Sequence, residues 1–452
     1  MSTQEKTAFE IEFIALESER LTNPADLTRI TTDLEIFEHI QKPYLTARML
    51  VVDDSNFYQE ADIFGSEKII IRLRSSENGS RAIQKTFYID KVESQEKIQD
   101  NARVLLIHLV EDIFYISSLI NINRHYSGKP SAIIKKIART FLSKQVISAG
   151  GSSPDGVSDA VQTSFKDTQN IRCIIPNLHP IEALQWITAR ASTAKGYPFY
   201  MYSTLVDREL IFEDLGAILS KESLNFGRDA KFIAQSTKVT SLDVATSRRV
   251  IKNYHFGNGS ENLLKIIRDG LITANTRKFK YDSKKDLFRK LLDDNILSKD
   301  QPNPQVHFGE KINDKTLDQH KSKYVTKIGG SNAFRIQPAI ENTEWTNSYS
   351  ETKTAAQYKL KVIQASMDSI FKKNPVTITV DGIEFLKGDF SKTVGSNIDV
   401  QFLATLNETT APGEILDKKK SGKYTIYSAR HMFKKTVQKY DIALNLIKIG
   451  NL

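Results

Sequence analysis

The chain has 452 residues, of which 40% are hydrophobic and 26% charged, so it can form a folded protein but exceeds what one hydrophobic core usually supports. Its net charge is +9, but 54 acidic residues are interspersed among 63 basic ones, an excess too thin for a dedicated nucleic-acid binder. The single cysteine, Cys173, excludes an intramolecular disulfide framework and a cysteine zinc site, and we expect it to be a small buried apolar residue. No signal-peptide pattern and no run of about 18 apolar residues occurs, so we expect no stable membrane insertion.

The first quarter of the chain is typical of β-strands with short connections. Six segments either alternate apolar and polar residues or are apolar throughout, and they cover 9–16, 33–40, 44–54, 67–74, 85–93 and 102–111. A short helical turn is expected within 55–67. This arrangement predicts an antiparallel sheet closed as a barrel over residues 1–125.

A helical connector is predicted over 126–196. Pro130 stands at a plausible helix start, and apolar residues follow at helical spacing, from Ile133 to Phe141. A glycine- and serine-rich loop comes next. A second helix is expected from His179, closing at Gly196.

A second β-region is predicted in two parts, 197–259 and 375–452. Between them, residues 260–374 read as a helix-rich insertion, with helices expected near 260–270, at 284–297 and at 352–374. From Arg277 to Lys327 there are 13 Lys and Arg against 8 Asp and Glu, which indicates a basic, solvated loop. The predicted class is therefore α+β, mainly β, with two tandem antiparallel barrels and inserted helix-rich segments.

The end of the first β-region and the end of the chain resemble each other. Residues 337 apart match without gaps, so that Ile89 corresponds to Ile426 and Leu105 to Ile442, and the 16-residue step between the two strands is preserved. This indicates that one hairpin is used twice. We expect packing positions at Phe87, Ile89, Leu105, Ile107 and Leu109 in the first copy, and at Tyr424, Ile426, Tyr440, Ile442, Leu444 and Leu446 in the second.

No catalytic or cofactor motif stands out in the sequence. The eight histidines show no paired metal-ligand spacing, and no nucleophile-elbow, Walker or dinucleotide pattern occurs. His431 alternates with Ala429 and Phe433 on a strand face, where a hydrogen-bonded packing histidine is expected. Carboxylates such as Glu93, Glu111 and Glu384 could form a glycosidase pair only if the fold placed two of them at a suitable separation, and each is expected to be a solvated charge.

Two segments resemble the baseplate hub proteins of T-even-type contractile-tailed phages. The first is 85–119, followed by the helix start at Gly128–Pro130, and the second is 411–449. In that family a Pro-Gly loop, here Pro412–Gly413, precedes a strand that carries Gly, Tyr and Ile, here Gly422, Tyr424 and Ile426. A histidine with a following aromatic residue comes next, here His431 and Phe433.

This resemblance implies a structural role without catalysis, cofactor or metal. Such hubs carry two tube-like barrels per chain, so that a homotrimer presents six barrels and joins a three-fold spike to a six-fold tail tube. The implied partners are further copies of the chain, a central spike protein, a tail tube or tube-initiator protein, and a tape-measure protein and DNA that pass through the lumen. The implied location is the virion baseplate, after assembly in the host cytoplasm.

Two alternatives remain open from the sequence. The chain could be the hub of a related contractile machine, such as a type VI or extracellular injection device, although such spike proteins usually continue into a needle, and no β-helix repeat follows here. It could instead be a cell-wall hydrolase whose carboxylate pair lies in the helical middle, 260–374.

Overall fold

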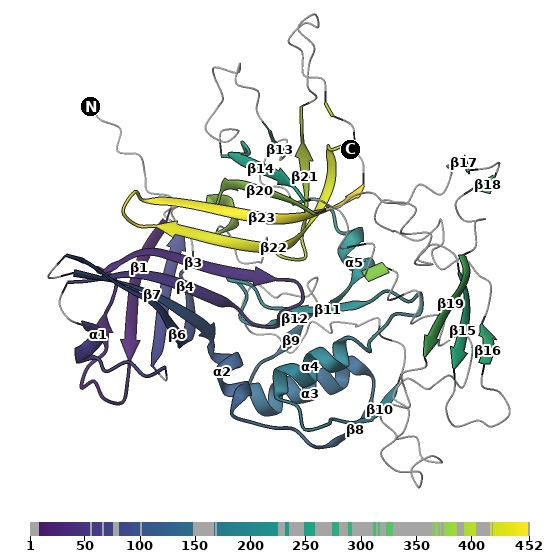
Figure 1. The fold of residues 1–452 in the computed structure, drawn as a ribbon, viewed down its shortest axis with the longest axis horizontal. Helices are drawn as coiled ribbons and strands as arrows, with labels where there is room; N and C mark the ends of the chain where they lie inside the picture. Colours follow the sequence, from purple (N-terminus) through teal and green to yellow (C-terminus); the bar gives the residue numbers. More distant parts are fainter. Residues whose placement is uncertain are drawn as a thin grey trace, which may run out of the picture.

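The computed structural model shows a mainly β molecule in which one long sheet, antiparallel except for one strand pair, links the two ends of the chain (Figure 1). The predicted mainly β class is confirmed. The described residues are 9–54, 57–65, 67–75, 81–99, 102–147, 167, 170–224, 231–234, 248–257, 274–279, 288–291, 311–312, 315–316, 322–328, 364, 367–368, 371, 375–386, 393–403, 416–417 and 419–450.

Six strands near the N-terminus form what we call the first strand set. Their spatial order is β3-β4-β7-β6-β5-β1, each antiparallel to its neighbours. Alternate residues point into a core, as in β4, where Ala47, Met49 and Val51 are buried. The bounds are β1(Phe9–Glu17), β3(Thr31–His39), β4(Thr46–Asp53), β5(Lys68–Ser75), β6(Ile83–Gln99) and β7(Ala102–Glu111), with the short strand β2(Ala25–Asp26) beside β1 and the helical turn α1(Phe57–Glu60) between β4 and β5.

Six further strands, most of them from the C-terminal part, form the second strand set. Their order is β14-β20-β23-β22-β21-β13. The bounds are β13(Lys231–Ile233), β14(Asn253–Phe256), β20(Pro375–Asp381), β21(Asn397–Gln401), β22(Gly422–Lys434) and β23(Lys439–Gly450), and the 3-10 turn η5(Ile383–Phe385) follows β20. The order repeats that of the first set, except that β13 runs parallel to β21 where β1 runs antiparallel to β5.

The two hairpins that end the two sets have the same register. Ile89 pairs with Leu109 in β6 and β7, and Ile426 pairs with Leu446 in β22 and β23, so both partners differ by 337 residues. The ladder then shifts by one residue in both hairpins, between Ile89 and Lys91 in the first and between Ile426 and Ser428 in the second. A shared bulge at the same step is a specific structural feature, because a bulge bends and twists the strand locally.

The neighbouring ladders match as well. β4 and β20 correspond at a spacing of 329 residues, so that Ala47 faces Leu109 as Val376 faces Leu446. β3 and β14 correspond at a spacing of 220, since Leu34 pairs with Met49 as Tyr254 pairs with Ile378. The chain thus carries the same four-stranded arrangement twice, in the order β3-β4-β7-β6 and β14-β20-β23-β22.

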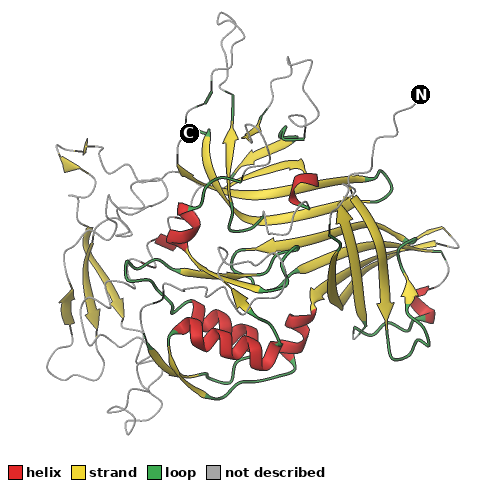
Figure 2. Ribbon diagram, turned by 180° about the vertical axis from the view of Figure 1, so that it is seen from behind, coloured by secondary structure: helices red, strands yellow, loops and turns green. Residues whose placement is uncertain are grey.

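A third layer, with most of the helices, lies beside the two strand sets (Figure 2). Its core joins apolar residues of α3 and α4 to β8, β10, β11 and β12. The strands β11 and β12 pair with β9 as a separate sheet, with Phe199 and Met201 in this core and Tyr200 and Tyr202 in the core of the second set. The bounds are α2(Asp112–Ser118), β8(His125–Gly128), α3(Pro130–Leu142), β9(Val146–Ile147), β10(Ile171–Ile174), α4(Pro180–Thr188), β11(Phe199–Tyr202), β12(Leu210–Asp214) and α5(Leu215–Ser220).

Several elements differ from the sequence prediction. The helix α3 begins at Pro130 as expected, but α4 ends at Thr188 instead of continuing to Gly196, which takes a positive φ of 86° in the following turn. β11 and β12 pair with each other and with β9 in a separate sheet and not with the second strand set, and the side chains on both of their faces are buried. The register of β22 with β3 also joins the two expected barrels into one sheet.

The insertion is less helical than predicted where it is described. The segment expected to be a helix over 284–297 contains the strand β16(Phe288–Leu291), which pairs with β15(Ala274–Phe279), and β15 pairs with β19(Ser322–Ile328). A short hairpin consists of β17(Lys311–Ile312) and β18(Lys315–Thr316). Gln364, Met367, Asp368 and Phe371 are helical, in agreement with the helix expected there, while the helix expected near 260–270 lies outside the described residues.

Candidate functional site

The two strand sets meet where β22 changes its partner. The first residues of β22, from Gly422 to Thr425, pair with β21 of the second set. After the bulge, residues Ser428 to Lys434 pair with β3 of the first set. We call this contact between the C-terminal half of β22 and β3 the joint. Figure 1 shows the β22–β23 hairpin, in yellow, lying along the purple strands β3 and β4.

A fully buried group of polar side chains lies inside the joint. The carboxylate of Glu38, on β3, has Oε1 3.0 Å from Nε2 of His431 and accepts the backbone N–H of Leu205 at 2.7 Å. Its other oxygen accepts the hydroxyl of Thr393 at 2.5 Å. Nδ1 of His431 lies 2.7 Å from the hydroxyl of Tyr440, on β23. These contacts join four segments that are far apart in the sequence.

The carboxylate of Glu38 is held in its charged form. Complete burial by itself would raise its pKa, because desolvation penalises a charge. The attraction and hydrogen bond of His431, with the bonds from Thr393 and the Leu205 N–H, outweigh this effect, so the pKa of Glu38 lies below its ordinary value. A carboxylate only accepts hydrogen bonds, so Nε2 of His431 donates to Glu38.

Aromatic rings from both sets close the joint. Phe433 on β22 stacks on Tyr440 at 4.4 Å between ring centroids and meets Phe9 of β1 edge to face at 5.2 Å. Phe433 and Tyr440 therefore lie in the hydrophobic core of the first strand set although they belong to the second hairpin. Burial of such rings removes a large apolar area from water, so the two sets share one core at this point.

The opposite face of the joint carries paired charges. Arg430 on β22 donates to both oxygens of Glu35 on β3, at 3.1 and 2.5 Å, and Arg48 on β4 also binds Glu35. These side chains are partly exposed. Burial alone would raise the pKa of Glu35, but the two guanidinium groups lower it on balance. The fork geometry of arginine suits such two-point contacts and fixes the register of the two strands.

The residues predicted as packing positions lie in two groups. Phe87, Ile89, Leu105, Ile107 and Leu109 are buried in the core of the first set. Tyr424, Ile426, Ile442, Leu444 and Leu446 are buried in the core of the second set, while Phe433 and Tyr440 cross to the first. Gly422 begins β22 with a positive φ of 157°, and His431 is 0% exposed inside the joint.

The sequence prediction missed Glu38. This residue continues the inward alternation of Leu34 and Ile36, which could have indicated its burial.

The three carboxylates considered for a glycosidase pair are each engaged with a different neighbour. Glu93 bonds His108 and lies 3.3 Å from Lys91 on the surface of β6. Glu384 lies 3.8 Å from Arg248. Glu111 is not the solvated charge that was expected, because it is only 2% exposed, accepts the backbone N–H of Leu45 and lies 3.6 Å from Lys85. Cys173 is buried as expected, and burial raises the pKa of its thiol to about 11.

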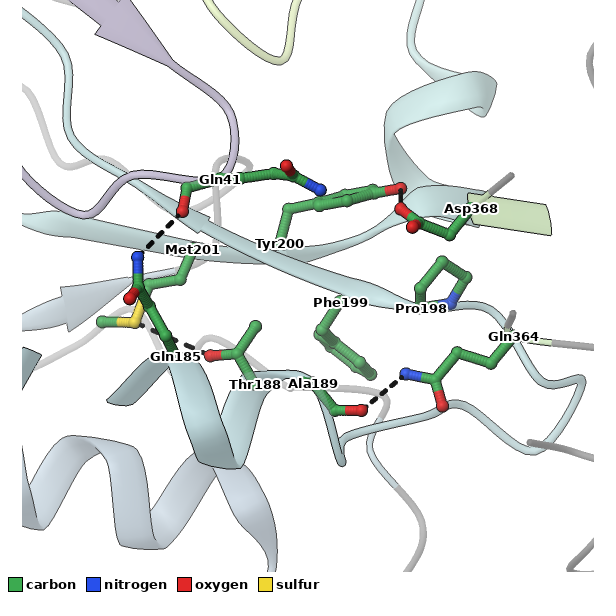
Figure 3. A pocket seen from close by; sticks show the side chains of 10 residues that line it. All are labelled: Gln41, Gln185, Thr188, Ala189, Pro198, Phe199, Tyr200, Met201, Gln364 and Asp368. Carbon is green, nitrogen blue, oxygen red and sulfur yellow. Dashed lines mark hydrogen bonds between the residues drawn. The ribbon is translucent and has the colours of Figure 1, made fainter. Parts of the chain in front are cut away.

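Neither a metal cluster nor a membrane-spanning helix is found in the described part of the chain. No group of three or more His, Cys, Asp or Glu there could hold a metal ion, and no helix is long and apolar enough to cross a membrane. A pocket of about 470 Å³ lies between α4, β11 and the helical residues Gln364 and Asp368 (Figure 3). Several polar groups that line it already bond one another or the backbone, as the Tyr200 hydroxyl bonds Asp368 at 2.8 Å.

The sequence matches no protein-family model and no curated protein. Solved structures with a similar chain path include a tail protein from Neisseria meningitidis, with a TM-score of 0.49 and 12% identity over 98% of this chain and 97% of that one. The 43 kDa tail protein of prophage MuSo2 from Shewanella oneidensis has a TM-score of 0.48 and 11% identity, over 96% and 98% of the two chains. A chain of the Francisella PdpA-VgrG complex has a TM-score of 0.45 and 11% identity, over 99% of this chain and 53% of that one. These structural neighbours are tail proteins and a VgrG complex, and at such scores the likeness does not assign a function to this chain.

Proposed function

We propose that the chain is a structural hub subunit of a contractile-tail baseplate. Its proposed partners are two further copies of itself, a central spike protein and a tail tube or tube-initiator protein. The observation that carries the proposal is the repetition of strand order and register within one chain, down to the shared bulge in β6 and β22. The proposal also draws on the sequence resemblance at 85–119 and 411–449.

The repetition suits a change of symmetry. A three-fold spike and a six-fold tube present different numbers of equivalent surfaces, so a connector needs six similar units from three chains. Each chain supplies two strand sets with the same order, and a homotrimer would therefore supply six. A head-to-tail contact that repeats and closes gives a ring of this kind.

The ring would leave a channel for DNA and a tape-measure protein. The sheet face opposite the cores carries charges that are mostly matched by neighbours: Glu35 binds Arg48 and Arg430, Glu93 binds His108 and Lys91, and Asp441 binds Lys252 and Lys439. A lumen lined by matched charges would hold DNA weakly, because phosphate binding depends on unmatched cations. The surplus of basic residues would then lie on outer and insertion surfaces.

The first test is the mass of the assembled protein. Light scattering coupled to gel filtration should give a species of three times the 51.2 kDa chain mass. A chain that stays monomeric at high concentration, alone and with its spike protein, would overturn the proposal.

The second test concerns catalysis, since we propose assembly and no enzymatic role. Purified protein incubated with peptidoglycan should release no soluble fragments above a buffer control. The variants Glu93→Gln, Glu111→Gln and Glu384→Gln should behave like the unaltered chain in this assay. Lysis that disappears with any single one of these changes would assign a glycosidase role to that carboxylate and refute a purely structural one.

A further inference from the structure

Both strands of the joint have a counterpart elsewhere in the chain. It pairs the C-terminal half of β22 with β3. By register, β22 corresponds to β6 of the first set, and β3 corresponds to β14 of the second. Each half of the joint therefore occurs a second time, as β6 and as β14.

In the part of the chain that the structure describes, β6 and β14 each have a stretch of edge that pairs with no other strand. In β6, only Ile83–Tyr88 pairs with β5, and in the described residues the part from Lys91 to Gln99 has β7 as its single ladder partner. β14 ends the long sheet and has β20 as its single ladder partner in the same described residues. These edges belong to different strand sets, separated by the rest of the sheet, so one cannot complete the other within a chain.

We propose that β6 of one chain pairs antiparallel with β14 of the next copy, repeating the joint at each boundary between chains. This inference rests on the proposed homotrimer and deepens it by naming the two strands and their register. In the joint, Arg430, which faces Ala443 of β23, pairs with Phe37 of β3. Because β7 corresponds to β23 and β20 to β4, the register of the joint can be transferred strand by strand to β6 and β14. The transfer predicts the pairs Gln95 with Phe256, Glu96 with His255 and Lys97 with Tyr254.

Side chains of β14 are exposed at positions where the equivalent side chains of β3 are covered. Leu34 and Ile36 point into the joint from β3, and both are 0% exposed. Their counterparts on β14 are Tyr254 and Phe256, of which Tyr254 is 50% exposed and Phe256 half-buried. A large aromatic residue at a position that is buried in the equivalent strand indicates a surface that another element covers.

The edge itself favours the same partner. An exposed strand edge presents backbone donors and acceptors that readily pair with another chain. Here the complementary edge is present on every copy, so the contact is head to tail and can close into a ring. No second kind of protein is needed to satisfy either edge.

Disulfide trapping tests the register. In the double variant Glu96→Cys/His255→Cys, the two positions face each other across the proposed ladder, where paired Cα atoms lie within reach of a disulfide. Mild oxidation of the full chain should convert most of it to covalent dimers and trimers on a non-reducing gel. The buried Cys173 is present in every variant and serves as the background.

The matched control shifts the register by one residue. In Gln95→Cys/His255→Cys the two side chains point to opposite faces of the sheet, so cross-linked species should fall at least several-fold. A trimer by light scattering whose double variants show no cross-links, or equal cross-links in both registers, would overturn this ladder while leaving the proposed hub intact. A monomer in the same measurement would overturn both.

A surface substitution provides a second readout. Tyr254→Asp places a charge in the proposed contact. Because Tyr254 is exposed in the single chain, the monomer should still fold normally, as measured by circular dichroism. Its apparent trimer dissociation constant should rise at least tenfold. The control Phe64→Asp changes an aromatic residue that is 73% exposed in the loop between α1 and β5, and it should leave the trimer unchanged. Equal trimer affinity of Tyr254→Asp and the unaltered chain would refute the contact.

Discussion

Replacing Glu38 by alanine should destabilise the chain by about 3–5 kcal/mol, because each buried donor left without its acceptor costs about 1–3 kcal/mol. The change leaves His431, Thr393 and the Leu205 N–H facing a cavity without their acceptor. Glu38 lies in the first strand set, while its partners come from β22, from the segment before β21 and from the loop after β11. The whole molecule should therefore lose stability in one transition. Urea unfolding followed by fluorescence and circular dichroism measures the loss.

A control and a double-mutant cycle separate the buried pair from a general loss of charge. Glu10→Gln removes one charge from an exposed pair with Arg74 and should leave the unfolding midpoint almost unchanged. The cycle of Glu38→Gln with His431→Gln should give a coupling energy of about 1–3 kcal/mol. Additive effects of the two changes would show that the pair does not stabilise the joint.

The same carboxylate should make the joint acid-sensitive. The pKa of Glu38 is lower in the folded chain than in the unfolded one, where a glutamate titrates at about 4.3. Its stabilisation is therefore complete above that unfolded value and is lost as the pH falls through the lower folded value. Unfolding free energies measured from pH 7 down to pH 3 should fall less steeply for Glu38→Gln than for the unaltered chain.

The strands of the first set and β20 to β23 of the second set were predictable from the sequence, and their long-range partners were not. Alternation of apolar residues indicates strands because side chains of a strand point to opposite faces in turn, and the spacing of 337 residues is visible because no insertion interrupts the two hairpins. The correspondence of β4 with β20 and of β3 with β14 is hidden by insertions that change the spacing to 329 and 220 residues.

The joint itself could not be read from the sequence. Ser428 pairs with His39, nearly four hundred residues away, and nothing local marks the point where β22 leaves β21 for β3. The inward alternation of Leu34, Ile36 and Glu38 indicates that Glu38 is buried, but identifies no partner. The strand β16 was missed for a different reason, since its segment has helical spacing while its position is decided by pairing with β15.

Replacing Phe433 by alanine should also cost about 3–5 kcal/mol, as for other fully buried phenylalanines. Phe433 belongs to the second hairpin but packs on Phe9 in the first core, so the loss should not be confined to one strand set. Hydrogen exchange should speed up in β4 and β7 as well as in β20 and β23. If the two sets were independent domains, only the second would lose protection.

Val437 provides the matched control, because it lies in the turn between β22 and β23 and is 64% exposed. Val437→Ala changes the same hairpin without opening a cavity, and its effect should stay within about 0.5 kcal/mol. A large loss in Phe433→Ala that leaves the amides of β4 and β7 as protected as before would show that the first set does not depend on the joint. Since the proposed contact between chains repeats the joint, such independence would also remove the physical reason to expect a rigid ring from six strand sets.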